Sequence, residues 1–241
     1  MSLPLVLLPG MGCSPDLWAG ARPERETVHG TIDTATLDGC VDSLLATLPP
    51  RFALAGLSLG GIVAMALTRR APERVAALCL IATNARPPTP AQQEAWAAQR
   101  QALQSGATAR SLQRALLPAL IAHRTPEQDE RVLAMADAVG ERAWDAQLAL
   151  QATRVDERPT LPAVRVPTLV VAGEKDVICP LVNHTEIAGA VPGAVLHVVP
   201  DAGHLVPVDS PAATATLLSD WLAVADDRVE ISAVRPARHP T

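Results

Sequence analysis

The sequence predicts an α/β fold in which a mostly parallel central sheet of about six strands is flanked by helices and carries a helical cap insertion. Short apolar runs alternate with segments whose apolar residues recur at helical spacing, a pattern typical of a parallel sheet covered on both faces. In residues 86–160 the alternation stops, and prolines mark both ends of this block. We therefore expect residues 1–85 and 161–225 to form the core, 86–160 the cap and 226–241 a C-terminal tail.

The first part of the core begins with an apolar run at residues 3–8, which ends at a proline-glycine pair as a buried parallel strand entering a loop does. A helix is expected to start near Ser14, because proline is favoured at the first helical position. A weaker strand at 27–32 precedes a helix at 38–48. The apolar residues of that helix recur at positions i, i+3, i+4 and i+7, so one of its faces would lie on the sheet.

The central strand is predicted at residues 52–55, and a nearly all-apolar helix follows it and reaches Arg70. Another continuous apolar strand occupies 75–83. Because residues 52–68 carry no charge, a membrane span is an alternative for them. That run contains glycines and is shorter than the roughly 20 residues a span needs, so we reject the span and expect a deeply buried helix.

The block at 86–160 is rich in Ala, Gln, Arg and Leu and has no strand candidate. Glycines at 106 and 140 and a turn at 123–126 divide it. The predicted cap helices are 90–105, 108–121, 126–139 and 141–154.

The alternation of strand and helix then resumes. The predicted elements are a strand at 168–172, a helix at 181–190 and a strand at 195–199. A last helix, capped by Asp209 or Ser210, is expected to reach Ala225. The mixed, proline-bearing tail at 226–241 is expected to be loosely ordered.

Composition excludes several classes of function. Charged residues make up 19% of the chain and the net charge is −5, so there is no basic stripe for nucleic acid and no attraction to anionic membranes. The four cysteines are scattered without metal-ligand spacing, and we expect no metal, no cofactor and no disulfide framework. The N-terminal segment lacks the features of a signal peptide, which leads us to expect a soluble, cytoplasmic protein.

A glycine-serine-glycine pattern connects the central strand to its helix. Glycine at 56 and 60 suits a tight bend, because a Cβ there would collide with neighbouring backbone, and the bend would expose Ser58 beside the helix N-terminus. Such a pattern arises by chance in roughly one chain of this length in ten, so alone it is weak evidence for a nucleophile.

Further chemically useful residues follow other predicted strands. Loops at the carboxyl ends of parallel strands meet at one edge of the sheet, where ligands bind. Met11 follows the first strand, Asp176 the strand at 168–172 and His204 the strand at 195–199. A histidine at this edge would deprotonate Ser58, and an aspartate would orient the imidazole.

These motifs together resemble the α/β-hydrolase superfamily over about residues 3–225. The elbow around Ser58, the acid loop ending at Asp176, and the Gly203-His204 loop match its pattern in that order. The resemblance is to compact carboxylesterases and lactonases. It implies a catalytic triad of serine, histidine and aspartate.

The same resemblance implies that the backbone N–H groups of Met11 and Leu59 form the oxyanion hole. The chain departs from the family where relatives commonly have His-Gly, because Pro9-Gly10 stands there. It also starts at the strand before this loop, which is why we expect a small sheet.

The substrate pocket would lie under the cap. With one Phe, four Trp and no Tyr in the chain, aliphatic side chains should dominate its lining. The candidates are Trp96, Leu116, Leu117, Leu120, Trp144 and Val177. Packing of the cap onto the sheet explains each of them equally well.

The sequence thus predicts an enzyme, a cofactor-independent serine hydrolase that cleaves a small-molecule carboxylic ester or lactone through an acyl-enzyme. Thioesterase, carbon–carbon bond hydrolase, perhydrolase and hydroxynitrile lyase chemistry use the same residues and stay open. So does a non-catalytic ligand-binding receptor on this scaffold. Serine at position 58 argues against dehalogenase and epoxide hydrolase activity, which need a carboxylate there.

Overall fold

The computed structural model describes the backbone of residues 2–234 and the side chains of residues 2–228. Within these residues, six strands form one sheet in the order β2-β1-β3-β4-β5-β6, and every neighbouring pair is parallel. The strands are β1 (Leu5–Leu8), β2 (Thr27–His29), β3 (Phe52–Leu57), β4 (Val75–Ile81), β5 (Thr168–Gly173) and β6 (Val195–Val199). The predicted α/β fold with about six strands is confirmed.

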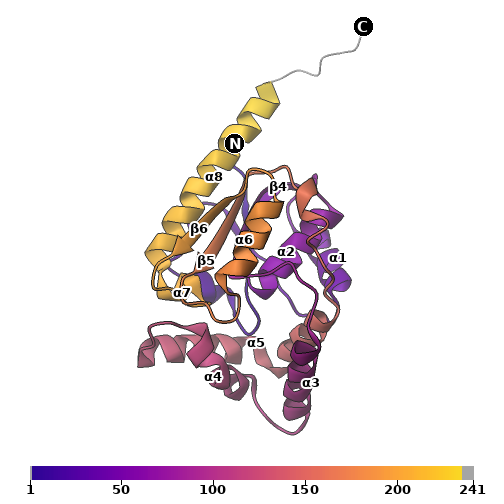
Figure 1. Ribbon diagram of the computed structural model, residues 1–241, viewed down its shortest axis with the longest axis vertical. Helices are drawn as coiled ribbons and strands as arrows, with labels where there is room; N and C mark the ends of the chain where they lie inside the picture. The colour runs from indigo at the N-terminus through magenta and orange to yellow at the C-terminus, as the bar shows by residue number, and fades with distance from the viewer. Residues whose placement is uncertain (1, 235–241) are drawn as a thin grey trace.

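Helices cover both faces of the sheet (Figure 1). One face packs against α1 (Leu37–Thr47), α2 (Leu59–Arg70) and α6 (Leu181–Ala190). The other packs against the one-turn 3-10 helix η1 (Pro15–Trp18), the short α7 (Val206–Asp209) and α8 (Pro211–Val234). Successive residues of β1 point alternately into these two clusters, as a strand buried on both faces requires.

Three further helices lie together beyond the sheet, at its lower end in Figure 1. These are α3 (Pro90–Gln104), α4 (Ala109–Leu120) and α5 (Pro126–Ala152), and we call them the cap. Thr89 and Thr108 begin α3 and α4 with reciprocal capping boxes. Gly140 interrupts α5 with a positive φ of 72°, at the turn predicted between two helices.

The last helix is longer than predicted. Instead of ending at Ala225, α8 continues to Val234, so the expectation of a loosely ordered tail is wrong for 226–234, while 235–241 lie outside the described residues. Tertiary contacts explain the difference, because the Asp226 carboxylate accepts hydrogen bonds from the Leu3 N–H at 3.2 Å and from Arg25 Nη2 at 2.6 Å. None of the helices within 2–234 is long and apolar enough to cross a membrane.

The order of the strands in the sheet determines where the ligand crevice lies. The chain moves from β1 outward to β2 and then returns to add β3 on the other side of β1, so the order reverses between β1 and β3. The loops leaving two such strands diverge and open a crevice at their carboxyl ends. Met11 and Ser58 follow β1 and β3, so they lie at this crevice.

The loops after β5 and β6 touch through their backbones at Gly173. A Cβ built on Gly173 would lie 2.1 Å from the Gly203 carbonyl oxygen and 2.6 Å from that of Ala202. No side chain fits at such a distance. The absence of a Cβ therefore lets the Asp176 loop and the His204 loop meet.

We expect Gly173→Ala to lower the free energy of unfolding by about 1–3 kcal/mol, because the added methyl group forces two backbone segments apart. The matched control is Gly189→Ala in α6, where a Cβ has no neighbour within 4 Å. That change should raise stability by about 0.5–1 kcal/mol through helix propensity. Urea unfolding measures both, and equal effects of the two changes would contradict the close-approach argument.

Candidate active site

Ser58 lies in a strained turn between β3 and α2. Its backbone adopts φ 54° and ψ −112°, which non-glycine residues rarely do. A Cβ on Gly56 would lie 2.3 Å from the Gly60 carbonyl oxygen, and one on Gly60 the same distance from the Leu8 carbonyl oxygen. Both glycines of the sequence pattern are therefore required by close backbone approach, and the turn presents the Ser58 side chain at the crevice.

A chain of hydrogen bonds joins the three residues that follow β3, β5 and β6. His204 Nε2 lies 2.8 Å from Ser58 Oγ, and His204 Nδ1 lies 2.8 Å from Asp176 Oδ2. The other Asp176 oxygen accepts the N–H groups of Ile178 and Cys179 at 2.8 and 2.9 Å. Asp176 and His204 are both buried, so the carboxylate is fixed and orients the imidazole toward the serine.

Asp209 holds the histidine loop in place. Its Oδ2 accepts the Gly203 N–H at 2.7 Å and the Ala122 N–H at 3.1 Å, and the Leu205 N–H donates to the Leu120 carbonyl at 2.9 Å. The loop is thereby bonded to the end of α4. Asp209 was expected as a possible N-cap of the last helix, but it ends α7 and serves the histidine loop instead.

The loop after β1 is anchored from the cap. Gly12 has a φ of 68°, and its N–H donates to Gln147 Oε1 at 2.9 Å, while Gln147 Nε2 donates to the Ile32 carbonyl at 2.9 Å. The Trp144 ring occupies the space where a Gly12 side chain would be. Thus α5 supports this loop through Gln147 and Trp144.

The backbone N–H groups of Met11 and Leu59 at the crevice have no hydrogen-bond acceptor among the described residues. Leu59 is the first residue of α2, where backbone donors are unpaired and the helix dipole is positive. The loop with Met11 runs beside Ser58, since a Cβ on Gly10 would lie 3.6 Å from Ser58 Cβ. Both donors are therefore available to an anionic oxygen near Ser58.

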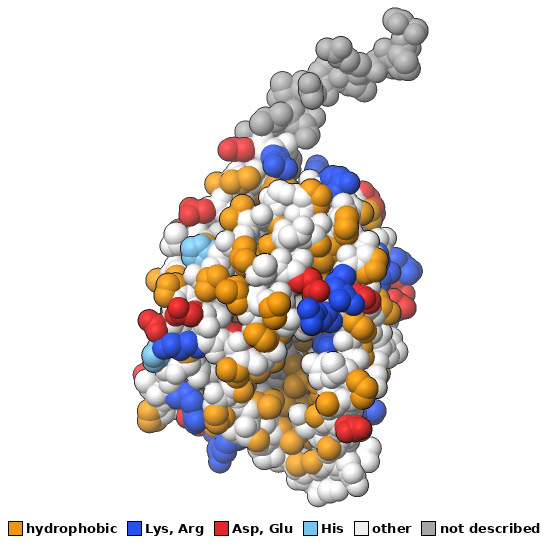
Figure 2. Space-filling view, viewed as in Figure 1, with side chains coloured by type: hydrophobic (Ala, Val, Ile, Leu, Met, Phe, Trp, Pro, Cys, Tyr) orange, Lys and Arg blue, Asp and Glu red, His pale blue; other side chains and the backbone are white. Residues whose placement is uncertain are grey.

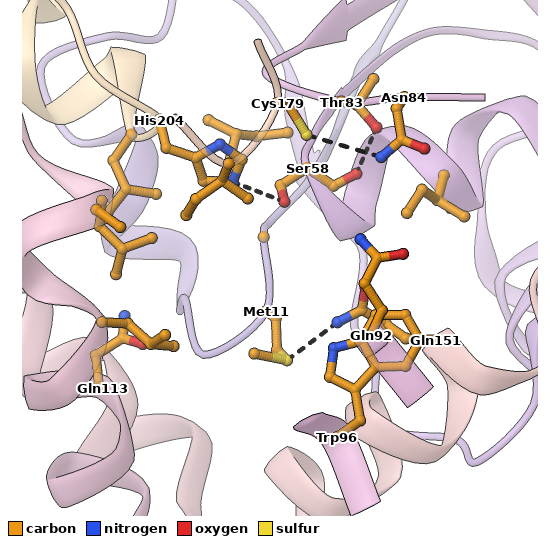
Figure 3. A pocket seen from close by; sticks show the side chains of 18 of the residues that line it. Met11, Ser58, Thr83, Asn84, Gln92, Trp96, Gln113, Gln151, Cys179 and His204 are labelled. Atoms are coloured by element: carbon orange, nitrogen blue, oxygen red, sulfur yellow. Dashed lines mark hydrogen bonds between the residues drawn. The ribbon is translucent and has the colours of Figure 1, made fainter. Parts of the chain in front are cut away.

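A cavity of about 230 Å³ opens between the core and the cap and contains Ser58 and His204 (Figure 3). The molecular surface is hollowed there, and hydrophobic side chains border the hollow (Figure 2). Trp96, Leu116 and Leu120 line the cavity as expected. Leu117 and Trp144 do not, because their helix faces turn them into buried clusters, and neither does Val177, which is 71% exposed.

The wall also carries polar side chains that the sequence did not single out. They are Asn84, Gln92, Gln99, Gln113, Gln151 and Arg154. All but Asn84 come from the cap helices or the residues just after them, where polar positions look like solvent-facing ones. Gln113 is fully buried, and both its amide nitrogen and its amide oxygen lack a partner within the described part of the chain.

One group of potential metal ligands coincides with the hydrogen-bonded chain. Donor atoms of Asp176, Cys179 and His204 lie within 4.8 Å of one another. The aspartate and histidine bond to each other, and burial raises the pKa of the Cys179 thiol to about 12, so that it keeps its proton. A protonated thiol is a poor metal ligand, and the donor set favours acid–base chemistry. All four cysteines are unpaired and buried.

A second buried histidine supports the Ser58 turn. His184 Nε2 accepts the Thr83 N–H at 3.2 Å, and Thr83 Oγ1 donates to the Ser58 carbonyl oxygen at 2.8 Å. Burial lowers the pKa of His184, with Asp176 opposing the shift. His184 thus acts as a neutral acceptor, a role that its helical position did not suggest.

Comparisons with known proteins identify the family to which the chain is similar. Residues 8–211 match the family described as alpha/beta hydrolase fold. The chain is 32% identical to a pimeloyl-[acyl-carrier protein] methyl ester esterase of Aromatoleum aromaticum, over 90% of this chain and 96% of that protein. It is 32% identical to a 2-hydroxymuconate semialdehyde hydrolase of a Pseudomonas species, over 88% and 76%. The structure of an esterase from Thermogutta terrifontis superposes with a TM-score of 0.81 at 26% identity, covering 93% of this chain and 91% of that one.

Two buried glutamines should respond oppositely to the same change. Gln113→Leu replaces an unpartnered amide by an apolar group of similar size and should raise the free energy of unfolding by about 1 kcal/mol. Gln147→Leu leaves the Gly12 N–H and the Ile32 carbonyl without their hydrogen-bond partner, and it should lower the free energy of unfolding by about 2 kcal/mol or more. Urea titration of both variants checks this. A destabilised Gln113→Leu protein would show that its amide is bonded.

Because the pKa of His184 is lowered, the unfolded chain takes up a proton there more readily than the folded one. The stabilising contribution is complete above pH about 6.5, the ordinary histidine pKa, and decreases as the pH falls below it. His184→Gln keeps an acceptor for the Thr83 N–H without titrating. We expect its stability to fall less than that of the wild type between pH 7 and 5, and identical slopes would disprove this role.

Proposed function

Since the chain belongs to the α/β-hydrolase family, whose relatives here are named esterases and hydrolases, we propose that this enzyme is a serine hydrolase that cleaves a carboxylic ester or lactone. The observation that carries the proposal is the continuous hydrogen bonding from Asp176 through His204 to Ser58 Oγ at the wall of the cavity. The methyl ester esterase similar to this chain supports an ester as the substrate.

In the proposed first step, His204 Nε2 takes the Ser58 proton as Oγ bonds to the scissile carbonyl carbon. Negative charge moves onto the carbonyl oxygen, and the N–H groups of Met11 and Leu59 stabilise it. His204 then gives its proton to the alkoxide as the carbon–oxygen bond breaks. The alcohol leaves, and the acyl group remains on Ser58.

In the second step, His204 takes a proton from water as the hydroxide oxygen bonds to the acyl carbon. The tetrahedral species collapses, Ser58 recovers its proton from His204, and the acid is released. The sum is ester plus water giving acid plus alcohol. With a lactone, acid and alcohol leave as one molecule.

Carbon–carbon bond hydrolysis is the second candidate, because the 2-hydroxymuconate semialdehyde hydrolase relative matches 88% of this chain. The two functions differ in the leaving group, which is a carbanion equivalent in one case and an alkoxide in the other. Hydrolysis of simple alkyl and aryl esters without a neighbouring enol would favour the esterase.

We expect a fluorophosphonate probe to label the purified protein at Ser58 and to abolish hydrolysis of 4-nitrophenyl butyrate. Ser58→Ala should lose labelling and at least about 10³-fold in kcat, because the nucleophile is gone. The matched control, Ser43→Ala on the surface of α1, should keep both. Mass spectrometry and absorbance assays measure these outcomes, and an unlabelled wild-type protein without esterase activity would refute the proposal.

A further inference from the structure

Arg154, two residues beyond α5, is a buried cation that has no acidic partner among the described side chains. It is 6% exposed, and it lines the same cavity as Ser58. Within the described residues, the one hydrogen bond of that guanidinium runs from Nη2 to Gln92 Oε1 at 2.8 Å, and no carboxylate lies within ion-pair distance. The buried Nε atom has no hydrogen-bond partner in the part of the chain that the structure describes.

Two other cap arginines provide a contrast. Arg100 pairs with Asp145 at 2.7 Å, and Arg110 pairs with Glu130 and Asp137, although these sites are more exposed and need compensation less. A guanidinium stays charged in proteins and offers five donors. Burying it without an anion costs free energy, and burial lowers the pKa of Arg154 accordingly. Among the described residues, the positive charge of Arg154 in the cavity is therefore not compensated by a negative charge.

The guanidinium is held ready for a ligand. Its carbon lies 5.2 Å from the centre of the Trp96 ring, so the aromatic face supports it. Gln92 is also fixed, because its Oε1 accepts the Thr89 N–H in the capping box of α3. Figure 3 shows Gln92, Trp96 and Gln151 together on one wall, across the cavity from Gln113. A rigid donor set of this kind binds an anion with little reorganisation.

We propose that Arg154 binds a carboxylate carried by the acid portion of the substrate, so that the preferred substrates are half-esters of dicarboxylic acids or lactones bearing a free carboxylate. This rests on the proposed function for the hydrolytic step. A carboxylate fits the planar guanidinium fork with two parallel hydrogen bonds. The acid portion stays on Ser58 through both steps, so an anchor for it acts throughout.

Charge balance favours a single carboxylate over a more highly charged group. Arg154 is the one cationic side chain other than histidine among the described residues of the cavity wall, and the remaining polar ones are neutral amides, a threonine and Ser58. One fixed positive charge matches one negative charge, and the cavity of about 230 Å³ accommodates a short aliphatic diacid.

The kinetic test compares the 4-nitrophenyl half-ester of adipate with 4-nitrophenyl hexanoate, which have acyl chains of equal length and differ in the terminal carboxylate. We expect wild type to prefer the adipate ester, and Arg154→Gln to reduce the ratio of the two kcat/KM values about 10- to 100-fold. Most of the change should appear in KM, because an anchor remote from the reacting carbonyl contributes equally before and in the transition state. Arg154→Lys should retain part of the preference.

The control is Arg100→Gln, an arginine of the same cap that already has an acidic partner and should leave both esters unaffected. Thermal melting of every variant separates loss of the anion site from loss of the fold, and the Lys variant serves if the Gln variant is unfolded. An equal loss on both esters in a folded Arg154→Gln protein would overturn the proposal, as would equal wild-type activity on the two esters.

A binding measurement separates this inference from the proposed reaction. Calorimetry with adipate on Ser58→Ala protein needs no turnover, and adding Arg154→Gln should raise the Kd at least about 10-fold. If adipate binding depends on Arg154 but the wild-type protein hydrolyses no ester, the anion site is supported and the esterase proposal is refuted. If the wild-type protein hydrolyses the hexanoate ester but adipate binding does not depend on Arg154, the esterase proposal holds and the anion site is refuted.

Discussion

The strained turn at Ser58 is the constraint from which the arrangement of the core follows. Its unusual backbone costs about 1–3 kcal/mol, so the surroundings must hold it. They do so through contact, since Gly60 lies so close to the carbonyl end of β1 that a Cβ would reach 2.3 Å from Leu8. The same contact brings the loop with Met11 beside Ser58. The almost complete apolarity of α2 has its reason here, because residues 59–68 of this helix pack on β1, β3 and β4 and against α1, and all of them are buried.

The cap belongs to the site as much as the strands do. Gln147 from α5 bonds the Gly12 N–H, and Asp209 bonds both Gly203 in the histidine loop and Ala122 at the end of α4. Two of the loops that converge on Ser58 are thus fixed by hydrogen bonds to the cap. Buried Glu157 accepts a hydrogen bond from Arg69 Nε at 3.0 Å, and this ion pair joins the returning chain to α2. Movement of the cap would therefore disturb the loops around Ser58 as well as the cavity.

The alternation of strands and helices along the chain and the positions of Ser58 and His204 after strands follow from local patterns, which is why the fold class was predictable from the sequence. The directions of the side chains on the cap helices could not be predicted from such patterns. Leu117 and Leu120 are one turn apart, yet only Leu120 reaches the cavity. Nothing in the sequence singled out Arg154, because polar positions near helix ends usually meet water. The extension of α8 past Ala225 depends on Asp226 bonding to distant residues, information that no local window contains.

A lone buried cation in a chain of net charge −5 implies a particular route to specificity. The overall charge disfavours the approach of an anionic substrate at long range, but at physiological salt such fields decay over about 8 Å. Inside the cavity, where Arg154 is 6% exposed, one guanidinium at hydrogen-bond distance outweighs distant, screened carboxylates. Recognition would then depend on short-range geometry at Arg154 rather than on electrostatic steering. Burying that charge without a partner destabilises the unliganded protein. A bound carboxylate compensates the charge, and the free energy recovered adds to the binding affinity.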